Sequence, residues 1–175
     1  MINNDFIATE LGVAEPFPES LLEVSTKFTM AFYYSENMFF SRDASTRRCR
    51  DYSLYILSII NDVCSEKIND AFDYFKERYT SSEGSLNRLY ALTMESDEGP
   101  KRLSIAIEND LLEAKGDLQR MLAVCLAIII RLRHNLLHAN KYEAMMNSPN
   151  EQEELLSSGY ELMASLLRAS NSNKK

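Results

Sequence analysis

The stretch MLAVCLAIII, residues 121–130, is the longest apolar run of the chain, and Arg120 and Arg131 close it on either side. Its ten residues are too few for a helix that crosses a bilayer, which needs about 20. We therefore predict that the run forms the centre of a helix buried in the core of a folded protein. Gly116 is expected to mark the break before this helix, so that the helix extends over about 117–139.

Segments on both sides of this run repeat apolar residues at the intervals of an amphipathic helix. Between about 44 and 79 no Pro or Gly interrupts the pattern, which predicts one long helix. Ser148 and Glu151 have the spacing of a capping box at the start of the last helix. The remaining predicted helices are 19–40, 85–94, 101–115 and 150–169, with connectors at 80–84, 95–99 and 140–147.

The pattern as a whole predicts the fold class. No segment alternates with the period of a β-strand, and five Gly and four Pro are too few for the turns of an all-β sandwich. Hydrophobic residues make up 45% and charged residues 26%, which excludes wholesale disorder. We predict an all-α helical bundle that occupies 1–175 as one domain, with a flexible lead segment at 1–18 and a flexible tail at 170–175.

The net charge and the cysteines limit the classes of function that we expect. The formal net charge is −7, which excludes a nonspecific nucleic-acid coat protein, because such a protein neutralises phosphates with a basic surface. A local basic pocket on an acidic body is still compatible with this charge. Three cysteines without a C-x-x-C pair predict reduced thiols, and the first residues lack the features of a signal peptide. We therefore expect a cytoplasmic protein that does not associate with a membrane.

The two histidines of the chain, His134 and His138, lie in the stretch RLRHNLLH, residues 131–138, directly after the apolar run. Because a helix turns about 100° per residue, both histidines lie on one face of the predicted helix. Arg131 and Asn135 lie on the same face. Arg133 instead points about 140° away from His138, toward the apolar side of the helix. Either the helix ends or bends before His138, or an acidic partner holds Arg133 from behind.

These residue types suit one kind of chemistry. An imidazole titrates near neutral pH, so it can take a proton from a hydroxyl and return one to a leaving group. A guanidinium is a permanent cation whose planar fork matches phosphate oxygens. An amide can position either group. Together they are the parts for cleaving a phosphodiester without a metal, and a nucleophile supplied by the substrate's own 2′-hydroxyl would make that substrate RNA.

The same residues resemble a known family. Arg133, a polar residue after it, and His138 have the form of the Arg-x4-to-6-His motif of HEPN domains. The stretch RHNLLHANK, residues 133–141, is similar to the subgroup with Arg-Asn-Asn-Leu-Phe-His-Gly. Ala139 stands where that subgroup has Gly, and Leu137 where it has an aromatic residue. The resemblance covers roughly 117–168, and the first hundred residues match only in being helical.

The resemblance implies an α-helical bundle that dimerises and places two motifs at a shared cleft. It also implies metal-independent endoribonuclease activity in a toxin–antitoxin or antiphage system, with no cofactor. By position, Arg133 is the phosphate and transition-state residue and His138 the catalytic histidine. His134 and Asn135 orient them. Arg131, Lys141 and Tyr142 are expected to contact the RNA, and the expected partners are RNA, a second copy of the chain and a cognate antitoxin protein.

Two other interpretations stay open at this point. A non-catalytic adaptor that binds a protein or a nucleotide is favoured modestly by the net charge, and predicts that internal acids cap Arg133 and His138 away from solvent. The nuclease predicts that the same two side chains line an open, positively charged groove. His134 and His138 also have the i, i+4 spacing of a two-histidine zinc site. That site lacks a Glu between the histidines, and the nearest acid is Glu143.

Overall fold

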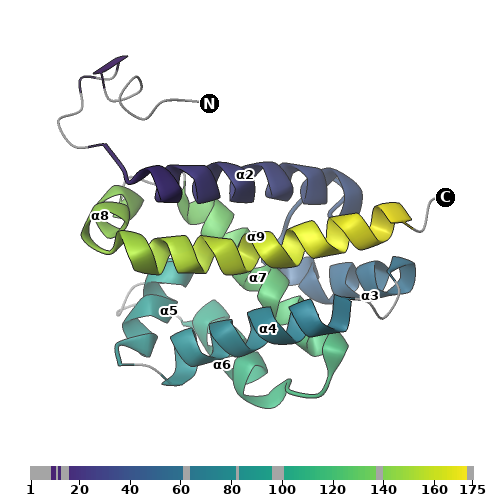
Figure 1. Cartoon of the computed structure of the whole chain (residues 1–175). Helices are drawn as coiled ribbons and strands as arrows, with labels where there is room; N and C mark the ends of the chain where they lie inside the picture. Colours follow the sequence, from purple (N-terminus) through teal and green to yellow (C-terminus); the bar gives the residue numbers. More distant parts are fainter. Residues whose placement is uncertain are drawn as a thin grey trace.

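A computed structural model describes residues 9–10, 12, 16–60, 64–81, 83–95, 101–136 and 140–172. Within these ranges every regular element is a helix or a helical turn, and no strand occurs. None of the described helices is both long enough and apolar enough to span a membrane. The predicted all-α bundle is therefore confirmed (Figure 1).

Most helices lie where the sequence pattern predicts them. The segment 140–147, predicted as a connector, is instead the helix α8, because it is rich in the helix formers Lys, Glu, Ala and Met. Gly116 has φ +93 and separates α6 from α7, as predicted. The helices are α2 (Glu19–Phe39), α3 (Cys49–Ile59), α4 (Ser65–Lys76), α5 (Ser85–Thr93), α6 (Arg102–Glu113), α7 (Leu118–Leu136), α8 (Asn140–Asn147) and α9 (Pro149–Ser172), with a 3-10 turn η1 (Thr46–Arg48) and a π-helical turn η3 (Glu77–Ser81).

The single long helix predicted over 44–79 is wrong. The chain forms η1 and α3, leaves the helical conformation at Ile60, which is extended with φ −105 and ψ 147, and starts α4 only at Ser65. The β-branched residues Ile59 and Ile60 are followed in the sequence by Asn and Asp, and all of these residue types have a low propensity for the interior of a helix. Both α3 and α4 pack against α7. The helical spacing of apolar residues continues across the break because α3 and α4 each bury an apolar face.

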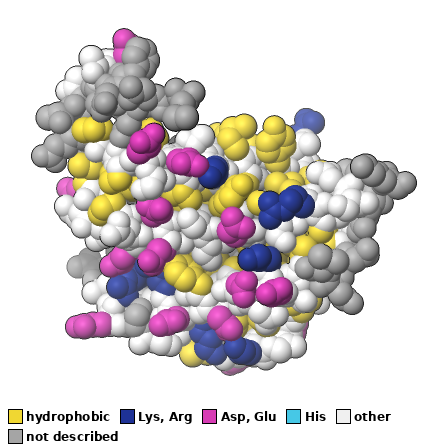
Figure 2. All heavy atoms as spheres, in the orientation of Figure 1, with side chains coloured by type: hydrophobic (Ala, Val, Ile, Leu, Met, Phe, Trp, Pro, Cys, Tyr) yellow, Lys and Arg dark blue, Asp and Glu magenta, His cyan; other side chains and the backbone are white. Residues whose placement is uncertain are grey.

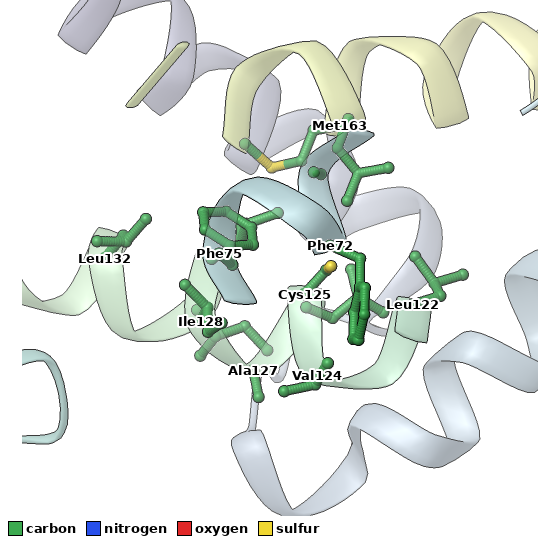
Figure 3. Packing of buried hydrophobic residues seen from close by; sticks show 14 of the residues in the cluster. Phe72, Phe75, Leu122, Val124, Cys125, Ala127, Ile128, Leu132 and Met163 are labelled. Atoms are coloured by element: carbon green, nitrogen blue, oxygen red, sulfur yellow. The ribbon is translucent and has the colours of Figure 1, made fainter. Parts of the chain in front are cut away.

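The predicted core helix is confirmed as α7, in which every residue from Met121 to Ile130 is buried. Figure 3 shows Phe72 and Phe75 of α4 facing Cys125 and Ile128 of α7, with Met163 of α9 beside them. Burial removes these side chains from water and stabilises the bundle by about 2 kcal/mol for each large one. The described part of α7 ends at Leu136, so the predicted end near 139 lies outside the described residues.

α2 and α9 lie side by side and run in the same direction (Figure 1). Ser20 donates a hydrogen bond to Glu153 at their beginnings, and Ser170 donates one to Met38 at their ends. Gly159 allows the close approach of the two helices, since a Cβ there would meet the Phe28 ring at 2.8 Å. With α2 and α9 against one another and α3 to α6 packed on α7, the C-terminal end of α7 is held between α5 and α2.

Candidate functional site

Arg131 and Asn135 bind the C-terminal end of α5. The Arg131 guanidinium donates to the carbonyl oxygens of Leu92 at 3.2 Å and Thr93 at 2.8 Å. The Asn135 amide donates to the carbonyls of Ala91 at 3.2 Å and Leu92 at 3.0 Å. The last carbonyls of a helix have no partner inside it, so these donors satisfy groups that burial would otherwise leave unpaired. The end of α7 is thereby anchored to α5.

The end of α5 is locally strained. Met94, the residue after the helix, has φ +58 and lies in the left-handed region that favours glycine. A left-handed residue turns the chain sharply away from the helix and exposes the last carbonyls. Arg131 and Asn135 fill the place that this turn creates. The predicted shared face of these two side chains is therefore confirmed, and its neighbour is α5.

Glu95 joins the same region to α6. Its carboxylate accepts hydrogen bonds from the backbone N–H groups of Leu103 at 2.8 Å and Ser104 at 2.9 Å, in the first turn of α6. Burial raises the pKa of Glu95, but these bonds and one from the Ser104 hydroxyl outweigh it, so the pKa lies below its ordinary value. Burial also lowers the pKa of Arg131, and the Glu95 charge acts against that shift.

Arg133 points to another neighbour. Its guanidinium carbon lies 5.6 Å from the centre of the Phe32 ring of α2, and Phe32 is 1% exposed. The Arg133 side chain is half-buried. Among the described residues no carboxylate lies within 4 Å of it, so the acidic partner that the sequence allowed is replaced there by an aromatic face. The positive charge of Arg133 is not neutralised by this contact.

The structure describes only some of the other predicted site residues. His134 is exposed. His138 lies outside the described residues, as do the side chains of Lys141 and Tyr142. The structure thus brings Arg131 and Asn135 together against α5 and turns Arg133 toward α2. The predicted roles in RNA cleavage stay predictions for all seven candidate residues: Arg131, Arg133, His134, Asn135, His138, Lys141 and Tyr142.

His134 and His138 have the sequence spacing of a two-histidine zinc site. In the described ranges no three or more His, Cys, Asp and Glu side chains are grouped so that they could hold a metal ion. Glu143, the nearest acid in the sequence, is exposed on α8. His138, the second histidine of the predicted zinc spacing, lies outside the described residues.

A pocket beside Asn135 was missed by the sequence patterns. Its volume is about 230 Å³, and it lies between η3, α5, α7, α8 and α9. Arg78 of η3 and Arg88 of α5 both pair there with Glu151 of α9, at 3.5 and 3.8 Å. The predicted capping box is wrong in this respect, because Glu151 turns to the two arginines and the Ser148 N–H donates to Ala144.

Comparison with known proteins adds nothing to this geometry: the chain matches no model of a protein family, no curated protein and no solved structure. The family expectation therefore rests on the motif residues alone. What those residues can do follows from the charge and contacts at the end of α7, where one guanidinium is bound to carbonyls and another lies on an aromatic ring.

Proposed function

We propose that the chain is a metal-independent endoribonuclease of HEPN type, with Arg133 and His138 as its catalytic pair. The observation that supports it is the state of Arg133: a half-buried guanidinium with no carboxylate within 4 Å among the described residues. A cation that is partly desolvated and not neutralised attracts a phosphate more strongly than one in bulk water. His138 follows Arg133 by five positions in the sequence, so the proposed acid–base group belongs to the same short segment as that cation.

The proposed reaction uses the substrate's own nucleophile. His138 takes the proton of a ribose 2′-hydroxyl, and the 2′-oxygen attacks the neighbouring phosphorus. Arg133 stabilises the charged phosphorane, in which the negative charge is largest. The bond from phosphorus to the 5′-oxygen breaks, and a histidine returns a proton to that oxygen. The products are a 2′,3′-cyclic phosphate end and a 5′-hydroxyl end.

A second copy of the chain is part of the proposal. α2, which carries the ring under Arg133, exposes three large apolar side chains spaced for one face: Met30 at 49%, Tyr33 at 50% and Tyr34 at 65%. Figure 2 shows hydrophobic side chains exposed along the edge of the molecule where α2 lies. Such a surface supports a homodimer in which two motifs share one RNA. A role as a toxin or antiphage effector with a cognate antitoxin follows only from the resemblance.

The experiment is RNA cleavage in the presence of a chelator. Purified wild type is incubated with bulk cellular RNA in EDTA beside His138→Ala and a control, Arg168→Ala, which changes an exposed arginine of α9. We expect wild type and the control to fragment the RNA equally. Loss of a general acid–base group lowers a rate by about 100-fold or more, so His138→Ala should leave the RNA intact. Identical fragmentation by wild type and His138→Ala would contradict the proposal.

A non-catalytic adaptor is the second candidate, and one observation favours it. Arg131 and Asn135 use their donors on carbonyls of α5, which is a structural use of the motif region. The adaptor predicts that wild type leaves RNA uncut at every condition and that motif substitutions change only thermal stability or partner binding. Fragmentation that depends on His138 in EDTA would exclude the adaptor.

A further inference from the structure

The pocket beside Asn135 has walls of two kinds. Leu132 of α7, Leu155 of α9 and Tyr79 of η3 give it an apolar side. Arg78, Arg88 and Glu151 are the charged residues among those that line it. With a volume of about 230 Å³, it is smaller than the sites of drug-sized ligands, which start at about 300 Å³. It suits a compact ligand with one charged group and one small organic part.

The charged side of the pocket favours an anion. The Arg78 side chain is 12% exposed and that of Arg88 31%, so both guanidiniums are partly withdrawn from water. Among the residues that line the pocket, these two positive charges stand beside one negative charge, that of Glu151. Glu151 lies in the first turn of α9, a helix of 24 residues, whose N-terminal dipole adds positive potential. A ligand with two negative charges would balance the pair of arginines.

Glu151 is held loosely in its present place. Its Oε2 lies 3.5 Å from Arg78 and 3.8 Å from Arg88, whereas a close charge-assisted bond is about 2.8 Å long. Its side chain is 49% exposed and can turn into solvent. The carboxylate therefore occupies a position between two guanidiniums from which a better anion could displace it.

Asn135, one of the residues that line the pocket, has a buried hydrogen-bond acceptor without a donor among the described residues. Asn135 is 7% exposed, its amide nitrogen is bound to α5, and its Oδ1 has no hydrogen-bond partner among the described residues. A buried acceptor without a donor costs about 1–3 kcal/mol. Tyr79 is 2% exposed, and burial raises its pKa to about 12, so it stays a neutral phenol at physiological pH.

From these observations we propose that the pocket binds a small phosphate monoester, whose dianionic phosphate replaces the Glu151 carboxylate between Arg78 and Arg88. The organic part of the ester then lies against Leu132 and Leu155, near the buried side chain of Asn135. This inference goes beyond the proposed nuclease and does not depend on it, since binding needs neither His138 nor cleavage. The proposed ligand site does lie against α7, because Asn135, three positions before His138 in the sequence, lines the pocket.

The test is calorimetric titration with ribose 5-phosphate as the probe, at pH 7.5, where a phosphate monoester is mainly a dianion. Ribose and inorganic phosphate are titrated in parallel. We expect saturable binding of ribose 5-phosphate to wild type, no binding of ribose, and inorganic phosphate binding weaker by about tenfold because it lacks the apolar contacts. Equal affinities for ribose 5-phosphate and inorganic phosphate would overturn the assignment of an ester.

Two substitutions with opposite expected effects make the test specific. Arg88→Gln should weaken binding of ribose 5-phosphate by about tenfold, because a charge-assisted bond is lost. Glu151→Gln should tighten it by about threefold or more, because the internal competitor loses its charge. Arg168→Gln, an exposed arginine farther along α9, is the matched control and should leave the affinity unchanged.

The sign of the Glu151→Gln effect decides the outcome even if Arg88→Gln does not fold, as judged by circular dichroism. Tighter binding supports displacement of the carboxylate. Unchanged or weaker binding in a folded Glu151→Gln protein overturns it, as does the absence of any saturable binding to wild type at millimolar ribose 5-phosphate. RNA cleavage is not read in this experiment, so its result is independent of the proposed nuclease activity.

Discussion

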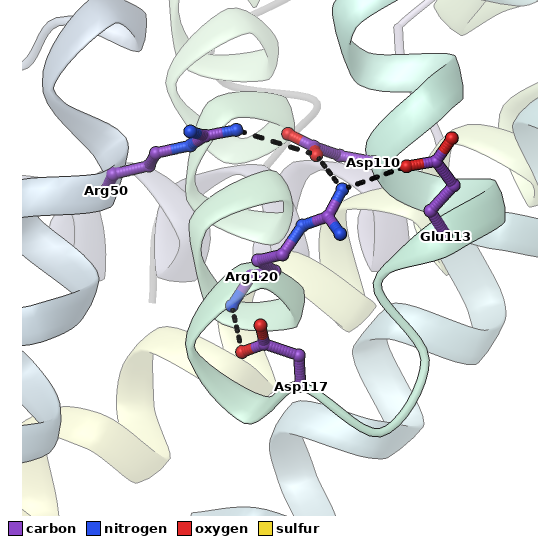
Figure 4. A network of polar contacts seen from close by, with 5 residues as sticks. All are labelled: Arg50, Asp110, Glu113, Asp117 and Arg120. Atoms are coloured by element: carbon purple, nitrogen blue, oxygen red, sulfur yellow. Dashed lines mark hydrogen bonds and ion pairs between the residues drawn. The ribbon is translucent and has the colours of Figure 1, made fainter.

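The two ends of α7 both carry arginines, and the structure stabilises their side chains in different ways. At the N-terminal end, Arg120 donates to Asp110 at 2.8 Å and to Glu113 at 3.4 Å, and Asp110 also faces Arg50 at 3.9 Å (Figure 4). Asp117 accepts the backbone N–H of Arg120 and so caps the helix. At the C-terminal end, Arg131 is bound to carbonyls and Arg133 lies on the Phe32 ring.

The difference concerns where positive charge is retained. The Arg120 cluster is a set of ion pairs at the surface, which contribute little stability and are weakened by salt. At the other end, carbonyl dipoles and a ring stabilise two guanidiniums, and among the described residues no carboxylate lies within 4 Å of either. In a chain of net charge −7, a site whose guanidiniums have no carboxylate within 4 Å among the described residues is suited to an anionic ligand.

The largest expected difference between the two ends of α7 is in the rate of RNA cleavage. Arg133→Ala removes the cation proposed to stabilise the phosphorane and should lower the cleavage rate by about 100-fold. Arg120→Ala removes a neutralised cation at the other end of the same helix and should leave the rate unchanged. The measurement is the initial rate on one RNA in EDTA. Equal rates for the two variants would show that the two ends do not differ in function.

The next effect is on stability. Arg131→Ala removes the side-chain donor to the Thr93 carbonyl and one of the two donors to the Leu92 carbonyl, which Asn135 still binds, and should lower the free energy of unfolding by about 2 kcal/mol. Arg120→Ala should cost less than about 1 kcal/mol, and that cost should shrink in 1 M NaCl. Urea unfolding at low and high salt measures both. A larger loss for Arg120→Ala would reverse the comparison.

A smaller effect is expected at Glu95 and depends on pH. Its pKa is lower in the folded chain than the ordinary value of 4.5, so its stabilising contribution is present above pH 4.5 and is lost as the pH falls through the folded pKa. Glu95→Gln should therefore lower stability by about 1 kcal/mol at pH 7, where the carboxylate caps α6. The difference from wild type should vanish in acid. A difference that is constant from pH 7 to pH 3 would contradict this account.

The smallest effect is expected to be a gain. Met94 is 45% exposed and has φ +58, a conformation that glycine adopts without strain. Met94→Gly should raise the free energy of unfolding by about 0.5 kcal/mol, provided that Arg131 and Asn135 still hold the end of α5. Thermal unfolding of Met94→Gly beside wild type measures it, and a clear loss of stability would show that the Met94 side chain has a packing role.

The core helix could be predicted from sequence because ten adjacent apolar residues leave little choice of environment. The break at Ile60 could not, since α3 and α4 each keep an apolar face and the period runs on across the gap. The helix wheel correctly placed Arg133 on an inward-facing side of α7. That Phe32 lies behind it depends on how α2 packs, which no local pattern contains.

The candidate site was predictable to a similar degree. The residues of the motif could be named from their types and spacing, but the carbonyls of α5 that Arg131 and Asn135 bind lie about 40 positions away in the chain. The pocket unites Arg78, Arg88 and Glu151 from three separate elements. Arg78 and Arg88 are isolated arginines in the sequence pattern, so only the fold shows that both lie next to Glu151.

The most direct test of the central claim is the chemistry of the RNA ends. A short RNA is cleaved by wild type in EDTA, beside the same RNA with a 2′-deoxy ribose at the cleaved position. The account predicts 2′,3′-cyclic phosphate and 5′-hydroxyl ends from the first RNA, and no cut at the deoxy position in the second. Cleavage at the deoxy position, or products with a 5′-phosphate, would contradict it.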